Sequence, residues 1–409
     1  MTEAGGAVLG AHQRRGSGDA RCPACGRASM DVFFQQHGVP VTSNVSFRTR
    51  EEALAAPRGD MRLAFCHACG LIANVAFEEQ PPGEEIETSQ AASPRFQEYA
   101  SGLARSWVDR YGLHGATVLE IGCARGEFLA TMLAAGAGHA IGVDPVLSGP
   151  DAPAEPEGMS FVGDVFRAEH LDGSVRAIVC RHTLEHLYES GGFLVSLRAA
   201  IGERDIVVLF EVPDVARVLR NAAFQDIYYE HCSYFSAGSL GRLFRRAGFE
   251  VLRLDRTYDD QYLVIEARPG TVAPVNAAEG GVDDRSELWQ GTRALRAGYA
   301  RRIDRMERLL GHAAARGERA VFWGAGSKAT AFLTALPNRD VVAGVVDINP
   351  RKWGTYIAGT GHEVIAPERL NALRPDLVVL MNPAYRDEVG RMLEALGVAA
   401  RLIGPDGDE

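Results

Sequence analysis

Four cysteines near the start of the chain have the spacing of a metal site. They form two Cys-x-x-Cys-Gly pairs, Cys22 with Cys25 and Cys66 with Cys69. The glycine of each pair permits a tight turn, so two thiolates can face one ion, and two such turns complete a tetrahedral zinc site. Because four thiolates leave no position open for water, the sequence predicts a structural Zn²⁺ rather than a catalytic one.

A second group of reactive side chains lies in the stretch FQDIYYEHCSYFS, where Tyr228, Glu230 and His231 occur close together. Histidine titrates near neutral pH and can act as a general base, and a carboxylate can orient its ring and stabilise the protonated form. A simpler interpretation is that the aromatic rings are half-buried with satisfied hydroxyls, and that the Glu-His pair is only a local hydrogen bond. Two further histidines, His182 and His186, occur in RHTLEHL.

A third pattern, ATVLEIGCARGEFLATMLAAG, is typical of an apolar strand, a glycine turn and a helix. Small residues in the turn let the backbone approach a ligand at the carboxyl end of the strand. An acidic residue ending the next strand can accept hydrogen bonds from ribose hydroxyls, and one ending the third strand could face an adenine amine. The residues assigned in this way to a nucleotide-containing cofactor are Glu120, Gly122, Ala124, Gly126, Asp144 and Asp164.

Two cofactors fit this pattern, a dinucleotide and S-adenosylmethionine. Glu120 favours the second, because a carboxylate just before the turn can reach the amino group of the methionine moiety. The run resembles the first motif of the class I S-adenosylmethionine-dependent methyltransferases, which is an acidic residue followed by G-x-G-x-G. A dinucleotide-dependent dehydrogenase is the least favoured alternative, and a Rossmann-like domain without any cofactor is another.

The elements that must position these residues alternate between short apolar strands and helices. After an amphipathic helix around 95–111, five strand-like runs are separated by helical stretches, which indicates a doubly wound, mostly parallel sheet. A helix at 237–248 is followed by FEVLRLDRTY and QYLVIEARPG, which we expect to form a terminal hairpin.

The last part of the chain repeats the strand–glycine–helix pattern on a smaller scale. A linker is predicted at 271–283 and a long helix at 284–316, followed by RAVFWGAGSKATAFLTAL and two more apolar strands. The residues Gly324–Lys328 open a helix whose free amide groups and lysine could receive an anion such as a diphosphate. A nucleotide fold kept only for packing is the alternative.

Composition excludes several classes of protein. The 409 residues are 46% hydrophobic and carry a formal net charge of −10, which favours packed domains and argues against nucleic acid or a membrane surface as the main partner. The N-terminus lacks the long apolar segment of a signal peptide, so we expect a cytoplasmic protein whose cysteines are thiols or metal ligands.

Together the three parts resemble the C-methyltransferases that act on nucleotide-linked deoxysugars. The resemblance spans roughly 20–405, and its most specific pieces are the cysteine quartet, the Y-x-E-H-x-S-Y-F run and VVDINPRKWGTYIAGTGHEVIAPERL. It implies a Rossmann-like class I methyltransferase core with an N-terminal zinc-binding module and a C-terminal Rossmann-like α/β domain. The predicted division is a disordered tail at 1–20, a zinc-binding domain at 21–80, the core at 81–270, a linker and helix at 271–316 and the C-terminal domain at 317–409.

The resemblance also implies a reaction. In that family a methyl group passes from S-adenosylmethionine to a sugar carbon next to a 4-keto group, and a histidine of the Y-x-E-H motif serves as base. Matched residue by residue, His231 is the expected base, Glu230 and Tyr228 support it, and His186 is the further active-site histidine. His182 is the alternative to His186, and it is otherwise assigned to the cofactor pocket.

Two segments depart from the family pattern and put the substrate in doubt. Around 85–93 the tyrosine-rich segment of sugar-acting members has no tyrosine, and at 259–262 Asp-Asp-Gln-Tyr replaces a Gly-Gly-Ser turn. From the resemblance we still expect a small-molecule substrate, a nucleotide-linked keto-deoxysugar of specialised metabolism, and a monomer or weak homodimer. The alternatives are a methyltransferase of the same architecture for a non-sugar carbon, oxygen or nitrogen acceptor, and a non-catalytic zinc-ribbon scaffold.

Overall fold

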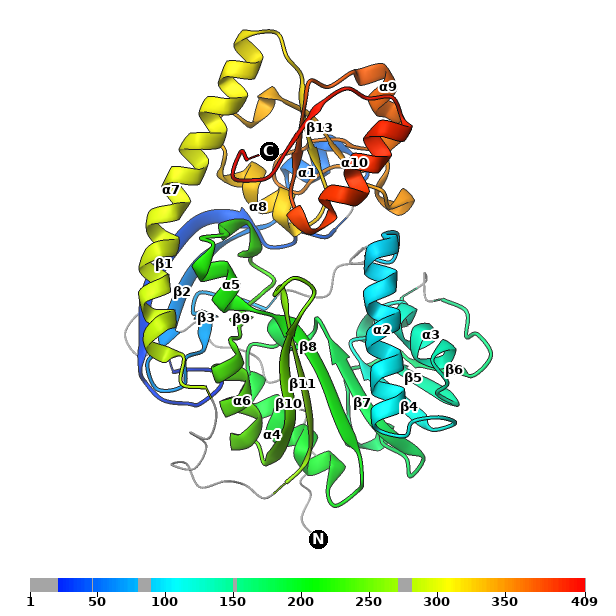
Figure 1. Ribbon diagram of the computed structural model, residues 1–409. Coiled ribbons are helices and arrows are strands. Elements are labelled where there is room, and N and C mark those ends of the chain that lie inside the picture. The colour runs from blue at the N-terminus through cyan, green and yellow to red at the C-terminus, as the bar shows by residue number, and fades with distance from the viewer. Residues whose placement is uncertain (1–20, 46, 80–89, 150–152, 271–281, 409) are drawn as a thin grey trace.

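The computed structural model describes residues 21–45, 47–79, 90–149, 153–270 and 282–408 (Figure 1). The predicted tail, most of the predicted linker and part of the tyrosine-free segment lie outside these residues. The described chain is organised around three β-sheets, of four, seven and five strands.

The seven-stranded sheet is built from the middle of the chain. Its order is β10-β11-β8-β7-β4-β5-β6, and only β11 runs antiparallel to its neighbours. The strands are β4 (Thr117–Ile121), β5 (His139–Val143), β6 (Met159–Val162), β7 (Val175–Arg181), β8 (Val207–Pro213), β10 (Phe249–Thr257) and β11 (Tyr262–Pro269). Strands such as β8 are buried over almost their whole length, as strands with both faces covered must be. The predicted mostly parallel sheet and its terminal hairpin are confirmed.

Helices flank this sheet at the positions expected from sequence. They are α2 (Pro94–Arg110), α3 (Glu127–Ala134), α4 (Ser190–Ile201), α5 (Val215–Arg220) and α6 (Ala237–Arg246). The side chain of Ser93 caps α2 and proline occupies its first turn, while Ser236 and Ser239 form a reciprocal cap on α6. These caps explain why both helices begin where they do.

The four-stranded sheet joins the N-terminal module to the core. Its strands β1 (Met30–Pro40), β2 (Arg58–Cys66) and β3 (Ile72–Asn74) are antiparallel, with the short helix α1 (Arg50–Leu54) between β1 and β2. The fourth strand, β9 (Ser233–Tyr234), comes from far along the chain and pairs with β3. The sequence did not predict this pairing, because a two-residue strand leaves no periodic pattern.

The five-stranded sheet is parallel and lies at the opposite end of the molecule from the seven-stranded one (Figure 1). Its order is β14-β13-β12-β15-β16. The elements are β12 (Ala320–Trp323), α8 (Ser327–Ala335), β13 (Val342–Val346), β14 (Val364–Ile365), α9 (Leu370–Leu373), β15 (Leu377–Leu380), α10 (Arg386–Ala395) and β16 (Arg401–Ile403). The second strand–glycine–helix unit of the sequence is thus a second Rossmann-like unit.

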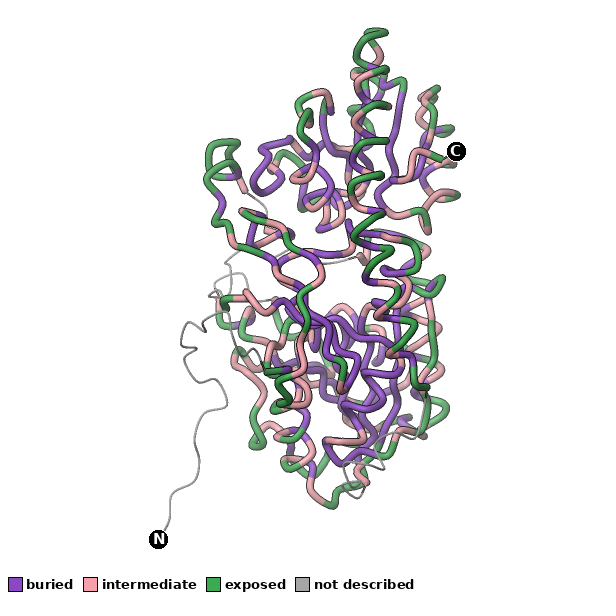
Figure 2. Tube along the Cα trace, turned by 90° about the vertical axis from the view of Figure 1, so that its left-hand side faces the viewer, coloured by how far each residue is buried: buried purple, intermediate pink, exposed green. Residues whose placement is uncertain are grey.

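The long helix α7 (Arg285–Ala315) runs beside the N-terminal sheet and connects the core to the C-terminal unit (Figure 1). Leu295 and Met306 on its buried face belong to one apolar cluster with Phe34 of β1, Leu219 of α5 and Phe322 of β12. Figure 2 shows the buried segments concentrated in the three sheets and along the inner sides of the helices that cover them. Because one cluster reaches all three parts, the described chain packs as a single body.

Among the described residues, no helix combines the length and apolar character that crossing a bilayer requires.

Candidate active site and cysteine cluster

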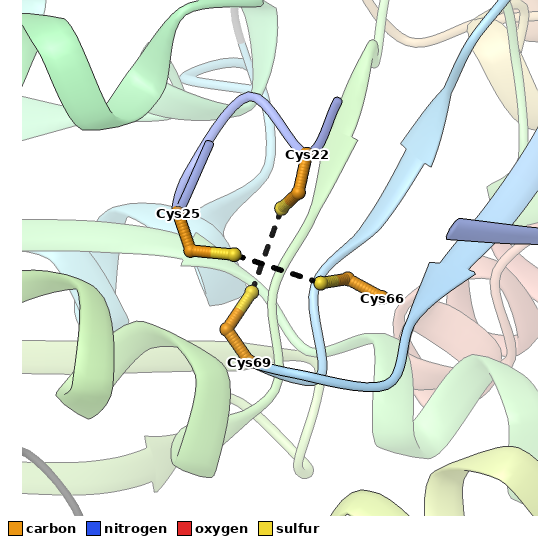
Figure 3. A group of neighbouring side chains, drawn as sticks. All are labelled: Cys22, Cys25, Cys66 and Cys69. Carbon is orange, nitrogen blue, oxygen red and sulfur yellow. Dashed lines mark hydrogen bonds between the residues drawn. The ribbon is translucent and has the colours of Figure 1, made fainter. Parts of the chain in front are cut away.

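The two cysteine pairs meet at one point (Figure 3). The Sγ atoms of Cys22 and Cys69 lie 3.5 Å apart and those of Cys25 and Cys66 lie 3.7 Å apart, and all four lie within 4.8 Å of one another. A tetrahedral zinc with bonds of about 2.3 Å needs sulfur–sulfur separations of about 3.8 Å. The four thiols therefore fit a closed zinc site, as the spacing predicted. The neighbouring His67 forms its own hydrogen bond, between Nε2 and Asp31 at 2.8 Å.

A cavity of about 680 Å³ opens between the carboxyl ends of the core strands and the C-terminal unit. Its core wall includes the glycine turn and the histidines that the sequence singled out, and its C-terminal wall includes the second glycine turn. The predicted site residues that line it are Glu120, Gly122, Ala124, His182, His186, Tyr228 and His231 on one side and Gly324, Gly326, Ser327 and Lys328 on the other.

The glycine turn is built for close approach to a ligand. Gly122 has φ of +73°, and a Cβ there would overlap the side chain of Thr183. Just before it, the buried Glu120 lines the cavity and keeps one carboxylate oxygen without a hydrogen-bond partner within the described structure. Burial raises the pKa of Glu120 to about 8, although Arg181 nearby acts in the opposite direction. An unpartnered carboxylate beside a glycine cradle fits the amino group of a methionine moiety.

Asp144 holds the glycine turn in place through hydrogen bonds to backbone amides. Its Oδ2 accepts a hydrogen bond from the amide of Ala124 at 2.8 Å and its Oδ1 accepts one from Val146 at 3.0 Å. Asp164 forms an ion pair with Arg167, with 3.0 Å between Oδ2 and Nε. Neither aspartate lines the cavity, and nor does Gly126, so three of the residues predicted for the cofactor are placed behind or beside it.

The second glycine turn has the same bracing. The amide of Ala325 donates to Oδ2 of Asp347 at 2.7 Å, and the amide of Asn349 donates to Oδ1 at 2.8 Å.

In the first turn of α8, Lys328 pairs with Asp226 of the core, and burial together with Arg217 lowers the pKa of Lys328 to about 7. Two cationic side chains thus face one carboxylate at this end of the cavity.

The histidine cluster lines the same cavity. His231 is 6% exposed, its Nε2 lies 3.0 Å from the hydroxyl of Tyr228, and its ring meets that of His186 edge-on at 4.8 Å. Burial lowers the pKa of His231 well below its usual value, and His186 and His182 lower it further. A neutral imidazole in this position can accept a proton.

Backbone pairing holds His231 in place. The chain turns sharply at Tyr228, whose carbonyl accepts hydrogen bonds from the amide of His231 at 3.2 Å and from the hydroxyl of Tyr234 at 3.1 Å. The next residues form β9 on the edge of the N-terminal sheet. The histidine is therefore fixed between the core and the zinc module.

Glu230 does not support His231 as expected. Its carboxylate accepts hydrogen bonds from the amide of Ser43 at 2.9 Å and from the hydroxyl of the same serine, whose oxygen lies 2.8 Å from the hydroxyl of Ser327 and can accept its proton. The side chain therefore connects the N-terminal module to α8. Glu230 lies inside the turn that the amide of His231 closes onto the carbonyl of Tyr228, so its side chain leaves the backbone in a different direction from that of His231.

The sequence analysis did not single out Glu185. This residue is 1% exposed, and its Oε1 lies 3.6 Å from Nδ1 of His182 and 3.9 Å from Nε2 of His231. The LEHL motif places Glu185 directly before His186, but sequence alone gave no sign that it is buried. Ligand-capable atoms of Glu185, His186 and His231 lie within 4.8 Å of one another.

Comparisons with known proteins agree with this architecture. A model described as a methyltransferase domain matches residues 95–254, and one described as a C-methyltransferase C-terminal domain matches residues 291–403. The C-methyltransferase NovU of Streptomyces niveus is 28% identical over 300 residues, which cover 69% of this chain and 70% of that protein.

Solved structures share a smaller part. A magnesium protoporphyrin IX methyltransferase from Synechocystis PCC 6803 is 16% identical, and the match covers 46% of this chain and 89% of that one with a TM-score of 0.33. A 1,6-didemethyltoxoflavin-N1-methyltransferase from Burkholderia thailandensis is 17% identical, with coverage of 49% and 96% and a TM-score of 0.30.

The core domain and its glycine turn define an S-adenosylmethionine-dependent methyltransferase of class I. The domain that follows it matches a C-methyltransferase C-terminal domain, so the chain is similar in both parts to C-methyltransferases such as NovU.

Replacing Cys66 by serine is expected to remove the metal and destabilise the protein, because three thiolates leave the site open to water. Metal analysis should find less than one zinc per chain, and the melting temperature should fall by several degrees. His67→Ala is the matched control and should keep its zinc. Full zinc content in the Cys66→Ser variant would contradict a four-cysteine site.

Replacing Gly122 by alanine is expected to weaken binding of S-adenosylmethionine at least about tenfold, because the positive φ and the overlap with Thr183 force the turn out of its present conformation, and restoring that conformation around the cofactor costs about 1–3 kcal/mol. Calorimetric titration measures this. Gly102→Ala on α2 is the control, because a Cβ there meets no other atom within 4 Å. Equal affinity in both variants would exclude the turn as the cofactor site.

Proposed function

We propose that the protein transfers a methyl group from S-adenosylmethionine to a carbon next to a ketone, on a nucleotide-linked deoxysugar in specialised-metabolite biosynthesis. The observation that carries this proposal is that His231, Tyr228 and His186 line the same cavity as Glu120 and the glycine turn. A base and a methyl-donor site in one cavity are what carbon methylation needs.

The reaction needs a base because a carbon bound only to hydrogen and carbon is no nucleophile. In this proposal His231 takes the proton from the carbon next to the ketone, and the electron pair of that C–H bond moves toward the carbonyl oxygen. His186 or the hydroxyl of Tyr228 donates a hydrogen bond to the developing oxyanion. S-adenosylmethionine, when bound, supplies an already activated methyl group, so the remaining task of the protein is to position the two partners.

Basic side chains in the cavity support a phosphorylated handle on the substrate. Arg217 and Lys328 line the cavity, and both form an ion pair with Asp226. The distance from Nη1 of Arg217 to Oδ2 of Asp226 is 3.5 Å. A diphosphate competes well for such groups because it offers more negative charge than one carboxylate. In this proposal the sugar portion lies beside the histidine cluster.

A second candidate is a methyltransferase of the same architecture acting on a non-sugar acceptor. Its support is that the two segments that depart from the sugar-acting pattern contact each other at the cavity. The amide of Gln90 donates to the hydroxyl of Tyr262 at 3.4 Å, and Gln261 accepts from Asn382 at 3.1 Å.

A radiolabelled methyl donor offered with a panel of nucleotide-linked 4-keto deoxysugars separates the two candidates. The proposal expects label on a sugar carbon, located by mass spectrometry and NMR. Label only on small molecules that copurify with the protein and contain no sugar would favour the second candidate.

Changing His231 to asparagine is expected to lower turnover by at least about 100-fold, since general-base catalysis contributes about 10²–10⁴. Affinity for S-adenosylmethionine should stay the same by calorimetry. His114→Asn, on an exposed histidine outside the cavity, is the control and should be fully active. Full turnover in the His231 variant would remove it as the base.

The lowered pKa of His231 also predicts the pH profile. A base must be neutral, and a pKa below 6.5 keeps the imidazole neutral down to that lower pH. The acid limb of kcat/KM should therefore lie below pH 6.5. An acid limb at or above that value would mean that a different group, or a differently placed His231, accepts the proton.

A further inference from the structure

Glu185 is a buried carboxylate to which the proposed reaction gives no role. It lies on the short 3₁₀ turn Leu184–His186 that follows β7, at the carboxyl edge of the core sheet, and it lines the cavity. Only 1% of the residue is exposed, yet neither carboxylate oxygen has a hydrogen-bond partner in the part of the chain that the structure describes. Such a group is costly to bury unless an opposite charge forms beside it.

The neighbours of Glu185 are imidazoles. Its Oε1 lies 3.6 Å from Nδ1 of His182 and 3.9 Å from Nε2 of His231. His182 has φ of +50°, a strained conformation for a residue other than glycine. Its Nδ1 points toward Glu185, its Nε2 lies 3.6 Å from Oε2 of Glu211, and its ring meets that of Tyr262 in an edge contact. The carboxylate is thus held against two rings that can become cationic.

The other carboxylates near the cavity are engaged elsewhere. Glu230 accepts hydrogen bonds from Ser43, and Glu211 accepts one from Nε of Arg181 at 2.6 Å and another from Tyr99. Among the described residues, Glu185 is the carboxylate that lies within ion-pair distance of His231. Tyr228, Tyr234, His186 and His182 are the other titratable groups that face the ring. Burial raises the pKa of both tyrosines, so their hydroxyls stay protonated, and an imidazole carries no negative charge.

We propose that Glu185, and not Glu230, is the positioning residue that stabilises His231 in its protonated form. This inference rests on the proposed function, in which the substrate C–H bond breaks, its electron pair moves to the carbonyl oxygen and the proton passes to His231. The imidazolium then forms next to Glu185, so the two charges neutralise each other inside the cavity. The proton stays on His231 until it is released, and Glu185 itself forms no bond.

NMR titration of the zinc-loaded, full-length protein tests the contact without any substrate. The His231 ring signal, assigned by its loss in His231→Asn, is followed with pH in wild type, Glu185→Gln and Glu230→Gln. Removing the charge of Glu185 should lower the pKa of His231 by about one unit or more, whereas Glu230→Gln should leave it unchanged. An unchanged pKa in Glu185→Gln, or an equal fall in both variants, would overturn the inference.

Turnover supplies the second readout. Glu185→Gln should lower kcat by about 100-fold and move the acid limb of kcat/KM to lower pH, and Glu185→Asp, which restores the charge, should recover part of the loss. Unaltered zinc content and melting temperature show that both variants fold. Turnover that is unaffected by Glu185→Gln would overturn the catalytic role.

These outcomes separate the two proposals. If His231→Asn stays active, the proposed base is wrong whatever the titration shows. If His231→Asn is inactive but Glu185→Gln leaves the pKa of His231 unchanged, only the inference fails. A divalent metal bound in addition to zinc in wild type, and lost in Glu185→Gln, would also overturn it, because Glu185 would then be a metal ligand.

Discussion

The pairing of two short strands, β3 and β9, determines where the candidate base lies. β3 begins three residues after Cys69, so its position is set by the cysteine cluster at its start. β9 begins two residues after His231 and pairs with β3 through Ser233 and Tyr234. The amide of Asn74 also donates to the carbonyl of Cys232 at 2.9 Å. The turn that carries Cys66 and Cys69 can therefore influence where the imidazole of His231 lies, although the two are not in contact.

This connection gives the N-terminal module a structural role at the cavity of the core. A Rossmann-like core places its cofactor turn at the carboxyl edge of the sheet without outside help, as the bracing by Asp144 illustrates. The segment between α5 and α6 is irregular apart from β9 and one short 3₁₀ turn, and its backbone contact with the end of β8 is limited to Phe235, whose carbonyl accepts from the amide of Val215 at 2.8 Å. Pairing with β3 supplies the missing backbone hydrogen bonds.

Much of the fold could be predicted from sequence, and the reason is that parallel strands and amphipathic helices leave continuous patterns. The core strands, the hairpin β10–β11 and the long helix α7 all followed from such patterns. The cysteine cluster followed from spacing alone. Which carboxylate lies beside His231 could not be predicted, because sequence adjacency to a histidine does not say where a carboxylate points. Glu230 turns toward Ser43, while Oε1 of Glu185, which is next to a different histidine in sequence, lies 3.9 Å from Nε2 of His231.

The burial of Glu185 could not be predicted from sequence either. A glutamate in LEHL looks like a solvent-exposed residue, and only the packing of the 3₁₀ turn against β9 shows that Glu185 is enclosed. Burial changes how much the interaction between Glu185 and His231 contributes in free energy. On the surface a carboxylate 3.9 Å from an imidazole contributes little, because water screens the pair. Inside the cavity the same distance acts in a medium of low polarity, so the pair is costly while His231 is neutral and favourable once it is protonated. A site arranged in this way favours the moment of proton transfer over the resting state.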